Sequence, residues 1–224
     1  MKSYAIAVDG PAGSGKSSVA KEVAKKLDII YVDTGAMYRA VGLYCMEQEI
    51  DTKSEIAVEA ILEEIKMDIK SEGGIQTILV NGQNVTVKIR TQEVGRAASD
   101  VAAILAVRKK LVEIQRNLTK ESCVIMDGRD IGTNVLPEAE VKIFLTADAD
   151  ERAKRRCNEL KLLGKKVDYN TVKREIIERD DKDRNRKYNP LQKAKDAIEV
   201  DTSKMTIEEV VQAILIIVAD KIKE

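Results

Sequence analysis

The 224-residue chain contains no histidine and no tryptophan. Without imidazole it cannot build a serine–histidine–aspartate triad, a histidine-ligated zinc site or a histidine proton relay. Aromatic residues make up only 3% of the chain, which argues against the base-stacking platforms of single-strand binders. Lys plus Arg and Asp plus Glu both number 38, so bulk basicity gives no argument for a nucleic acid partner. We expect no nucleic acid partner and a chemistry that works without histidine.

Cysteines and long apolar runs are also scarce. Cys45, Cys123 and Cys157 form no C-x-x-C pair, which favours a reducing compartment without a disulfide framework. We interpret them as small buried hydrophobes rather than reactive thiols. The longest unbroken apolar run, residues 213–219, is too short for a membrane span, and the run at residues 5–8 is too short for a signal peptide. We therefore expect a cytoplasmic protein that does not insert into membranes.

The rest of the composition, with 44% hydrophobic and 34% charged residues, is typical of a folded domain. Apolar runs rich in β-favouring residues alternate with segments of helical period, which predicts an α/β fold with a mostly parallel sheet covered by helices. Five buried strands are expected, at residues 4–8, 29–32, 123–126, 141–145 and 198–200. Helices are expected at about residues 16–27, 54–66, 91–116 and 207–221.

About ninety residues separate the second and third predicted strands, which is too long for one crossover. Within this stretch we interpret residues 75–80 and the alternating apolar residues at 85, 87 and 89 as two strands. Asn81-Gly82 between them is a strong signal for a hairpin turn. The sequence therefore predicts a small antiparallel insertion in the parallel fold.

A glycine-rich motif, G-x-x-x-x-G-K-S at residues 10–17, follows the first predicted strand and opens the first predicted helix. In such a loop the backbone N–H groups surround phosphate oxygens, the helix N-terminus adds its positive end, and the lysine reaches the β- and γ-phosphates. The dinucleotide fingerprint does not fit, because Ser18 stands where its last glycine is required. The motif predicts a nucleoside-triphosphate site, with ATP contacts from Gly10, Pro11, Ala12, Gly13, Ser14, Gly15, Lys16, Ser17 and Ser18.

Asp127 ends the third predicted strand. Because the carboxyl ends of parallel strands surround the ligand crevice, we expect Asp127 to lie beside Ser17. We predict that the Ser17 hydroxyl binds Mg²⁺ directly and that Asp127 binds it through a water molecule. A helix-capping role for Asp127 is the alternative. The chain has neither an N-K-x-D nor a D-x-x-G motif, which counts against a GTPase.

Five segments resemble the bacterial cytidylate kinases in sequence and order: DGPAGSGK at 9–16, DTGAMYR at 33–39, RTQEV at 90–94, DGRDIGT at 127–133 and ERDDKDRNR at 178–186. The middle three are specific to that family. The resemblance implies one P-loop nucleoside-monophosphate kinase domain over residues 1–224, with helices on both faces of a five-stranded parallel sheet. It also implies a monophosphate-binding insertion at about residues 66–100 and a lid at about residues 151–169.

The resemblance further implies that the chain transfers phosphate from ATP to CMP or dCMP with Mg²⁺, as a monomer in pyrimidine nucleotide salvage. The catalytic residues would be Lys16, Arg129 and Arg186. The monophosphate would be bound by Arg39, Arg129 and Arg186, and the cytosine edge by Ser99, Arg108 and Asp130. The ribose would be held by Arg179 and Asp183, with Thr34 also near the acceptor. The lid would close over ATP through Arg152, Arg155 and Arg156.

Other interpretations remain open on the residues alone. Residues 151–187 contain 14 Lys and Arg against 8 Asp and Glu, which is typical of a solvated helical face as well as of a phosphate-facing one. A different small-molecule kinase on the same loop, such as a shikimate or dephospho-coenzyme A kinase, would lack the segments at 90–94 and 127–133. An ATP-sensing module would bind ATP without an acceptor. A nucleic acid binder is disfavoured by the zero net charge and the scarce aromatic residues.

Overall fold

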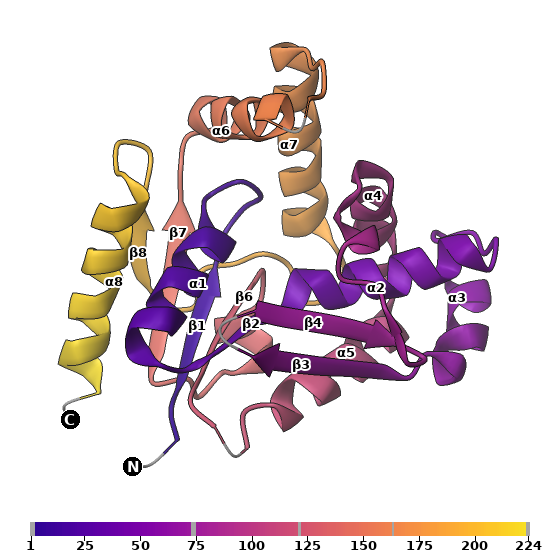
Figure 1. Ribbon diagram of the computed structural model, residues 1–224, viewed down its shortest axis with the longest axis horizontal. Coiled ribbons are helices and arrows are strands. Elements are labelled where there is room, and N and C mark those ends of the chain that lie inside the picture. Colours follow the sequence, from indigo (N-terminus) through magenta and orange to yellow (C-terminus); the bar gives the residue numbers. More distant parts are fainter. Residues whose placement is uncertain (1–2, 73–74, 121, 163, 223–224) are drawn as a thin grey trace.

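The centre of the protein is a five-stranded parallel sheet, seen in a computed structural model that describes residues 3–72, 75–120, 122–162 and 164–222 (Figure 1). Its order is β2-β6-β1-β7-β8, and every neighbouring pair is parallel. The strands are β1 (Ala5–Asp9), β2 (Ile30–Asp33), β6 (Val124–Gly128), β7 (Val141–Thr146) and β8 (Ile198–Asp201). The positions of the five predicted strands and the predicted fold class are confirmed, but β8, expected to be buried, is largely exposed because it lies at the edge of the sheet.

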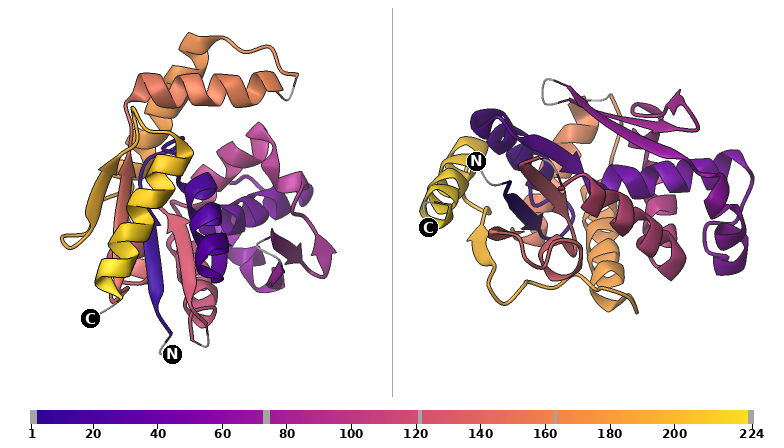
Figure 2. Two further views of the ribbon diagram at one scale, coloured as in Figure 1. Left: turned by 60° about the vertical axis from the view of Figure 1, so that its left-hand side comes forward. Right: turned by 90° about the horizontal axis from the view of Figure 1, so that it is seen from below.

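Helices cover both faces of this sheet (Figure 2). The α-helices of the described residues, not all of which lie on this sheet, are in chain order α1 (Lys16–Leu27), α2 (Thr34–Glu47), α3 (Glu55–Ile61), α4 (Gln92–Val101), α5 (Leu105–Asn117), α6 (Ala149–Leu162), α7 (Tyr169–Asn185) and α8 (Ile207–Lys221). The predicted bounds of α1 and α8 are confirmed. Ile6 of β1 packs in one apolar cluster with Val19 of α1 and Ile214 of α8, whereas Ala7 packs on the opposite face with Met126. Burial on both faces explains why β1, β2 and β6 appear as continuous apolar runs.

The thiols fit the interpretation as core residues. Cys45 and Cys157 are buried and Cys123 is half-buried, and all three are free. Burial raises the pKa of the Cys45 thiol to about 11, so its reactive thiolate form is scarce at neutral pH.

The expected antiparallel insertion is a separate sheet of three strands, β3 (Met67–Glu72), β4 (Ile75–Val80) and β5 (Gln83–Asn84). The predicted hairpin turn is confirmed, because Asn81 and Gly82 adopt positive φ angles of 50° and 79°. Strand β3 was not predicted. The expected helix at 54–66 ends at Ile61, a short 3₁₀ turn follows, and the chain is extended from Met67 onward. Met67 and Ile69 alternate toward the apolar cluster beneath the sheet, which favours a strand at this point.

The predicted strand at residues 85–89 is wrong. Val85 and Ile89 are buried but Val87 is 85% exposed, and the Ile89 N–H donates to the Val85 carbonyl at 3.0 Å. A spacing of four residues satisfies both a strand and a helical turn, so the apolar pattern was ambiguous. Here the chain forms a helical turn that runs into a 3₁₀ segment, Lys88–Arg90.

The predicted helix at 91–116 is divided into α4 and α5 by a break at residues 102–104. The break leaves the carbonyl of Ala102 to accept a hydrogen bond from Nη1 of Arg108 at 3.2 Å. Arg108, in the first turn of α5, is therefore held by a carbonyl group that would accept a hydrogen bond within the helix if the helix were unbroken.

Helices α2 and α4 cross closely at Gly42. A Cβ atom added there would lie 2.9 Å from the backbone nitrogen of Ala98 and 3.0 Å from the Cβ of Ala97. Helix propensity alone would make Gly42→Ala stabilising by about 0.5–1 kcal/mol. Overpacking acts in the opposite direction by about 1–3 kcal/mol, so we expect the free energy of unfolding to fall. Urea denaturation measures whether the free energy of unfolding falls or rises in the variant. A rise would show that α2 and α4 can move apart without strain.

Candidate active site

The phosphate loop between β1 and α1 has the backbone that its glycines allow. Gly10 has a φ angle of 148°, and a Cβ atom there would lie 2.0 Å from the carbonyl oxygen of Leu145. Gly13 has a φ angle of 75°. Among the described residues, no hydrogen bond to protein uses the N–H groups of residues 13–15. These groups therefore form an open set of donors suited to an anion.

Lys16 lies over this loop. Its Nζ donates to the carbonyl of Pro11 at 2.7 Å and to Oγ of Ser14 at 3.3 Å. Burial lowers the pKa of the ammonium group, and the charge of Arg129 lowers it further. Both oxygen atoms that accept hydrogen bonds from Nζ of Lys16 are uncharged, so the oxygens of a bound phosphate could take their place.

Asp127 is held by two hydroxyl groups. Ser17 donates to Oδ2 at 2.6 Å and Tyr31 donates to Oδ1 at 3.0 Å. The structure thus brings Ser17 and Asp127 together as expected, and neither carboxylate oxygen caps a helix. Burial raises the pKa of Asp127 to about 6, with the charge of Asp33 as the next cause.

The oxygens of Ser17 and Asp127 fit a magnesium site of a particular kind. Mg²⁺ is usually bound by one or two protein oxygens, with water and substrate phosphates completing its shell. Within the described ranges, no group of three or more His, Cys, Asp or Glu side chains could hold a metal ion by itself. The pair therefore suits a cation that arrives with a nucleotide rather than a permanently caged one.

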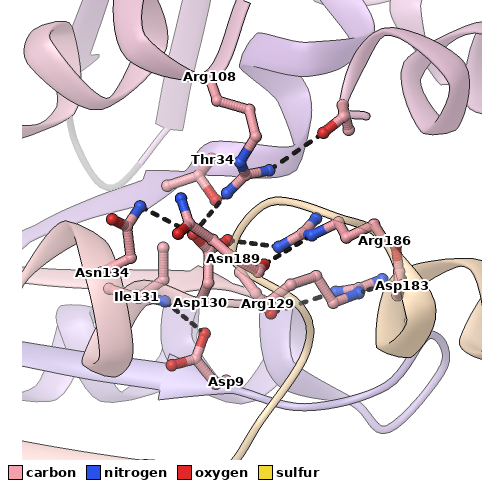
Figure 3. Close-up of polar contacts among 12 residues, drawn as sticks. Asp9, Thr34, Arg108, Arg129, Asp130, Ile131, Asn134, Asp183, Arg186 and Asn189 are labelled. Carbon is pink, nitrogen blue, oxygen red and sulfur yellow. Dashed lines mark hydrogen bonds and ion pairs between the residues drawn. The ribbon is translucent and has the colours of Figure 1, made fainter. Parts of the chain in front are cut away.

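Asp130 is the centre of a buried polar cluster (Figure 3). Its Oδ2 accepts hydrogen bonds from Nη2 of Arg108 at 2.5 Å and from Nδ2 of Asn134 at 3.0 Å. Its Oδ1 accepts one from Nη2 of Arg186 at 2.8 Å. Asp130 is 5% exposed and Arg108 is 1% exposed. The Nε atom of Arg108 has no partner in the part of the chain that the structure describes.

The three residues expected to read cytosine are not equally close. Arg108 and Asp130 are in direct contact, whereas Ser99 lies half-buried on α4 with no hydrogen bond to them among the described residues. Arg186 was expected at the monophosphate, and it pairs here with Asp130 while its Nε donates to the carbonyl of Asn189 at 2.6 Å. The groups expected to bind base and phosphate are therefore linked through one carboxylate.

A second ion pair joins the loop after β6 to helix α7. Nε of Arg129 donates to Oδ2 of Asp183 at 2.7 Å (Figure 3). Arg179, one turn earlier on α7, has a pKa lowered to about 10 by burial and then by the charge of Arg129. Its Nε is buried with no partner among the described residues. Arg129 is thus paired with a carboxylate while Arg179 close by has no ion pair among the described residues, an arrangement suited to a further anion.

Arg39 and Thr34 extend the site along α2. Nη1 of Arg39 donates to the carbonyls of Ile89 and Thr91 at 3.1 and 3.2 Å, which connects α2 to the end of the insertion. Oγ1 of Thr34 donates to the carbonyl of Asp127 at 2.7 Å. Both residues therefore lie at the carboxyl end of the sheet with the groups described above.

Helices α6 and α7 lie over this end of the sheet (Figures 1 and 2). Arg155 donates to Oγ1 and the carbonyl of Thr202 at 3.0 and 2.5 Å, and Thr202 in turn donates to the carbonyl of Ser14 in the loop at 3.3 Å. Arg156 pairs instead with Glu159 of its own helix at 3.0 Å. Arg152 contacts the loop directly, as described further below.

The family model described as cytidylate kinase matches residues 6–220. The chain belongs to the cytidylate kinase family. The predicted family is confirmed, and the match over nearly the whole chain favours it over the shikimate and dephospho-coenzyme A kinases.

Individual relatives of the family agree. The chain is 52% identical to the cytidylate kinase of Caldicellulosiruptor saccharolyticus, over 96% of this chain and 95% of the relative. It is 50% identical to that of Carboxydothermus hydrogenoformans (96% and 97%) and 48% identical to that of Bacillus licheniformis (98% of both). Among solved structures, a gluconokinase from Sinorhizobium meliloti aligns with a TM-score of 0.51 at 13% identity, over 98% of this chain and 94% of that one. That likeness concerns the fold alone.

Several residues of this cytidylate kinase family member contribute to the site although they were not predicted. Tyr31 holds Asp127, and the ring of Tyr38 lies 5.7 Å from the guanidinium carbon of Arg108. Both oxygens of Asp9 accept backbone N–H groups directly after Asp130, from Ile131 at 2.8 Å and Gly132 at 2.7 Å. Asp9 and Tyr38 stand inside the five recognised segments, which was the available signal; nothing in the sequence singled out Tyr31.

One unpredicted residue connects the insertion to the site. Oε1 of Gln76, on β4, accepts the backbone N–H of Asp33 at 2.6 Å. Asp33 also caps α2 through the N–H of Ala36 and pairs with Arg90 at 2.9 Å. The insertion is thus attached to the end of β2, where the acceptor residues begin. None of the helices in the described part of this chain is long and apolar enough to cross a bilayer.

Proposed function

We propose that the protein transfers the γ-phosphoryl group of ATP to CMP or dCMP, giving ADP and CDP or dCDP. One observation supports this most directly: Asp127 accepts a hydrogen bond from Ser17 of the phosphate loop at 2.6 Å and, through its carbonyl, one from Thr34, expected at the acceptor, at 2.7 Å. Donor and acceptor anions would therefore be held side by side. Such placement is what direct transfer between two phosphates requires.

The absence of histidine is compatible with this reaction. The attacking group is a phosphate oxygen of CMP, whose second pKa is ~6, so it is largely ionised at neutral pH without a general base. The barrier comes from bringing two anions together and from charge on the moving phosphoryl group. Lys16, Arg129 and Arg186 would neutralise that charge, while Arg39 would hold the acceptor phosphate.

We assign ATP to the loop of residues 10–18, with Arg155 and Arg156 closing from α6. Mg²⁺ would be held by the Ser17 hydroxyl and, through water, by Asp127, and it would neutralise part of the charge on the donor phosphates. The 2.6 Å contact between these two side chains supports this assignment. Tyr31 keeps the Asp127 carboxylate oriented toward the loop.

Cytosine recognition is assigned to Asp130, Arg108 and Ser99, and ribose binding to Arg179 and Asp183, with Thr34 nearby. Cytosine offers an amino donor at N4 and acceptors at N3 and O2, whereas uracil has an acceptor at O4 and a donor at N3. An ionised carboxylate has about four acceptor positions, and Asp130 uses three of them in the protein. A fourth remains for the N4 amino group, and the unpartnered Nε of Arg108 supplies a buried donor beside it.

The insertion at about residues 66–100 and the lid at about residues 151–169 are assigned to closure over the two nucleotides. Helix α6 of the lid and the adjoining α7 share an apolar cluster, which includes Cys157, Leu160 and Val172 and is separate from the sheet core. That arrangement suits a part that moves as a unit. Closure would exclude water and limit wasteful ATP hydrolysis.

An ADP-release assay with CMP, dCMP, UMP, AMP or no acceptor tests the proposal, with chromatographic identification of the products. We expect rapid ADP release and diphosphate product with CMP and dCMP, slower turnover with UMP and AMP, and loss of activity when EDTA removes Mg²⁺. ADP release that is equally fast without an acceptor would instead indicate an ATP-driven switch.

A further inference from the structure

The carboxylate of Asp180, on α7, holds the phosphate loop at Ala12. Its Oδ1 accepts the N–H of Ala12 at 3.2 Å, and its Oδ2 accepts Nη1 of Arg152, on α6, at 2.6 Å. The same Nη1 also donates to the carbonyl of Ala12 at 2.9 Å. Asp180 is 3% exposed and Arg152 is 5% exposed. Both polar backbone groups of one loop residue are thus held by one buried ion pair.

Holding Ala12 has a defined effect on the next residue. The carbonyl of Ala12 and the N–H of Gly13 belong to one planar trans peptide and point in opposite directions. Arg152 therefore fixes the direction of the Gly13 N–H, the first of the open donors in the loop. Gly13 has a φ angle of 75°, which glycine adopts and leaves easily, so the loop itself constrains this peptide weakly.

Asp180 also lies among the residues assigned to the acceptor. It follows Arg179 directly and is one helical turn from Asp183, which pairs with Arg129. Helix α7 therefore carries the groups that would hold the acceptor and the carboxylate that holds the donor loop. A shift of α7 of a few tenths of an ångström would change the 3.2 Å contact to Ala12.

We propose that Asp180 and Arg152 are positioning residues that couple the two substrate sites, so that CMP bound along α7 strengthens ATP binding at the loop and ATP strengthens CMP binding. This inference rests on the proposed function, because it takes CMP and ATP as the two ligands. Coupling of this kind is reciprocal and typically amounts to a factor of about 5–150 in affinity. A purely structural ion pair would stabilise the fold without producing such a factor.

The test measures the dissociation constant of CMP by calorimetry, with and without a non-hydrolysable ATP analogue and Mg²⁺. For the unaltered protein we expect the analogue to tighten CMP binding by about fivefold or more. In Asp180→Asn the ratio should fall below about twofold, with CMP affinity in the absence of the analogue nearly unchanged. Arg152→Lys, which keeps the charge but not the planar fork that spans Ala12 and Asp180, should show the same loss and serves if Asp180→Asn does not fold.

A matched control is available on the same two helices. Asp150 of α6 pairs with Lys173 of α7 at 2.8 Å and has no contact with the loop among the described hydrogen bonds. Asp150→Asn should lower the thermal stability, and the ATP analogue should tighten CMP binding by the same factor as in the unaltered protein. Coupling retained in Asp180→Asn or Arg152→Lys, or lost equally in Asp150→Asn, would overturn the inference. If the ATP analogue leaves the dissociation constant of CMP unchanged in the unaltered protein while CMP is turned over normally, the inference is overturned and the proposed function stands. If CMP does not bind, both the inference and the proposed function are overturned.

Discussion

Replacing Lys16 by methionine is expected to lower kcat for CMP phosphorylation by about 10²–10³ and to leave the fold intact. Lys16 supplies the only side-chain cation in the loop motif, and its ammonium group already lies over the loop. Methionine keeps the apolar stem and removes the charge that would neutralise the moving phosphoryl group. Steady-state assays with saturating ATP and CMP, together with circular dichroism, measure both parts of the prediction.

Lys142 offers a matched control. It is also a buried lysine that donates to a proline carbonyl, that of Pro137 at 2.5 Å, and it pairs with Asp196 at 2.7 Å. Lys142→Met should lower thermal stability but change kcat by no more than about threefold, because no role in phosphate binding is assigned to it. If Lys16→Met retains more than about a tenth of the normal kcat, the loop is not catalytic in the way proposed.

The second large effect is expected for Asp130→Asn. The amide keeps one acceptor oxygen but turns an N–H toward one of two buried arginines, Arg108 and Arg186. Removing one partner of a buried ion pair lowers the free energy of unfolding by about 3–5 kcal/mol. Because the amide has the same shape as the carboxylate, we expect Asp130→Asn to lower it by only part of that amount. The N–H group of the amide would also face the N4 amino group of cytosine, and both are hydrogen-bond donors. We therefore expect kcat/KM for CMP to fall by about 10–100-fold and the ratio of kcat/KM for CMP to that for UMP to decrease.

Asp183→Asn separates base reading from general damage to the site. Asp183 is likewise a buried carboxylate paired with an arginine, and it is assigned to the ribose, which CMP and UMP share. Its replacement should depress kcat/KM for both nucleotides alike. Arg186→Ala is a poorer control, because Arg186 contacts Asp130 itself. A CMP-to-UMP ratio that stays at its normal value in Asp130→Asn would contradict the base-reading role, even if the enzyme phosphorylates CMP.

Much of the fold could be predicted because its signals are local. Strands β1, β2 and β6 are largely buried on both faces, so each appears as a continuous apolar run. The phosphate loop is defined by the spacing of glycines and lysine within eight residues. The meeting of Ser17 and Asp127 followed from a rule about strand ends, which does not depend on the loops between them.

The rest depended on which distant segments meet. Val85 and Ile89 fit both the strand and the helical period, and only the core beneath them decides which one is formed. The contacts from Asp180 to Ala12 and from Gln76 to Asp33 join residues far apart in the chain, and no local pattern specifies such partners. Motif resemblance named Arg186 and Asp130 separately, but their ion pair follows from how α7 and the loop after β6 are placed.

The central position of β1 matters for how the chain is made. Its two neighbours, β6 and β7, lie about 120 residues or more further along the chain. At about 5–20 residues per second, a ribosome needs about 6–24 s to extend the nascent chain that far. During that time Ile6, Ala7 and Val8, which are fully buried in the finished protein, have no strand to pair with and are open to chaperones. The segment that leads into the phosphate loop is thus synthesised well before either of its neighbours in the sheet, and it cannot join the sheet until they have emerged.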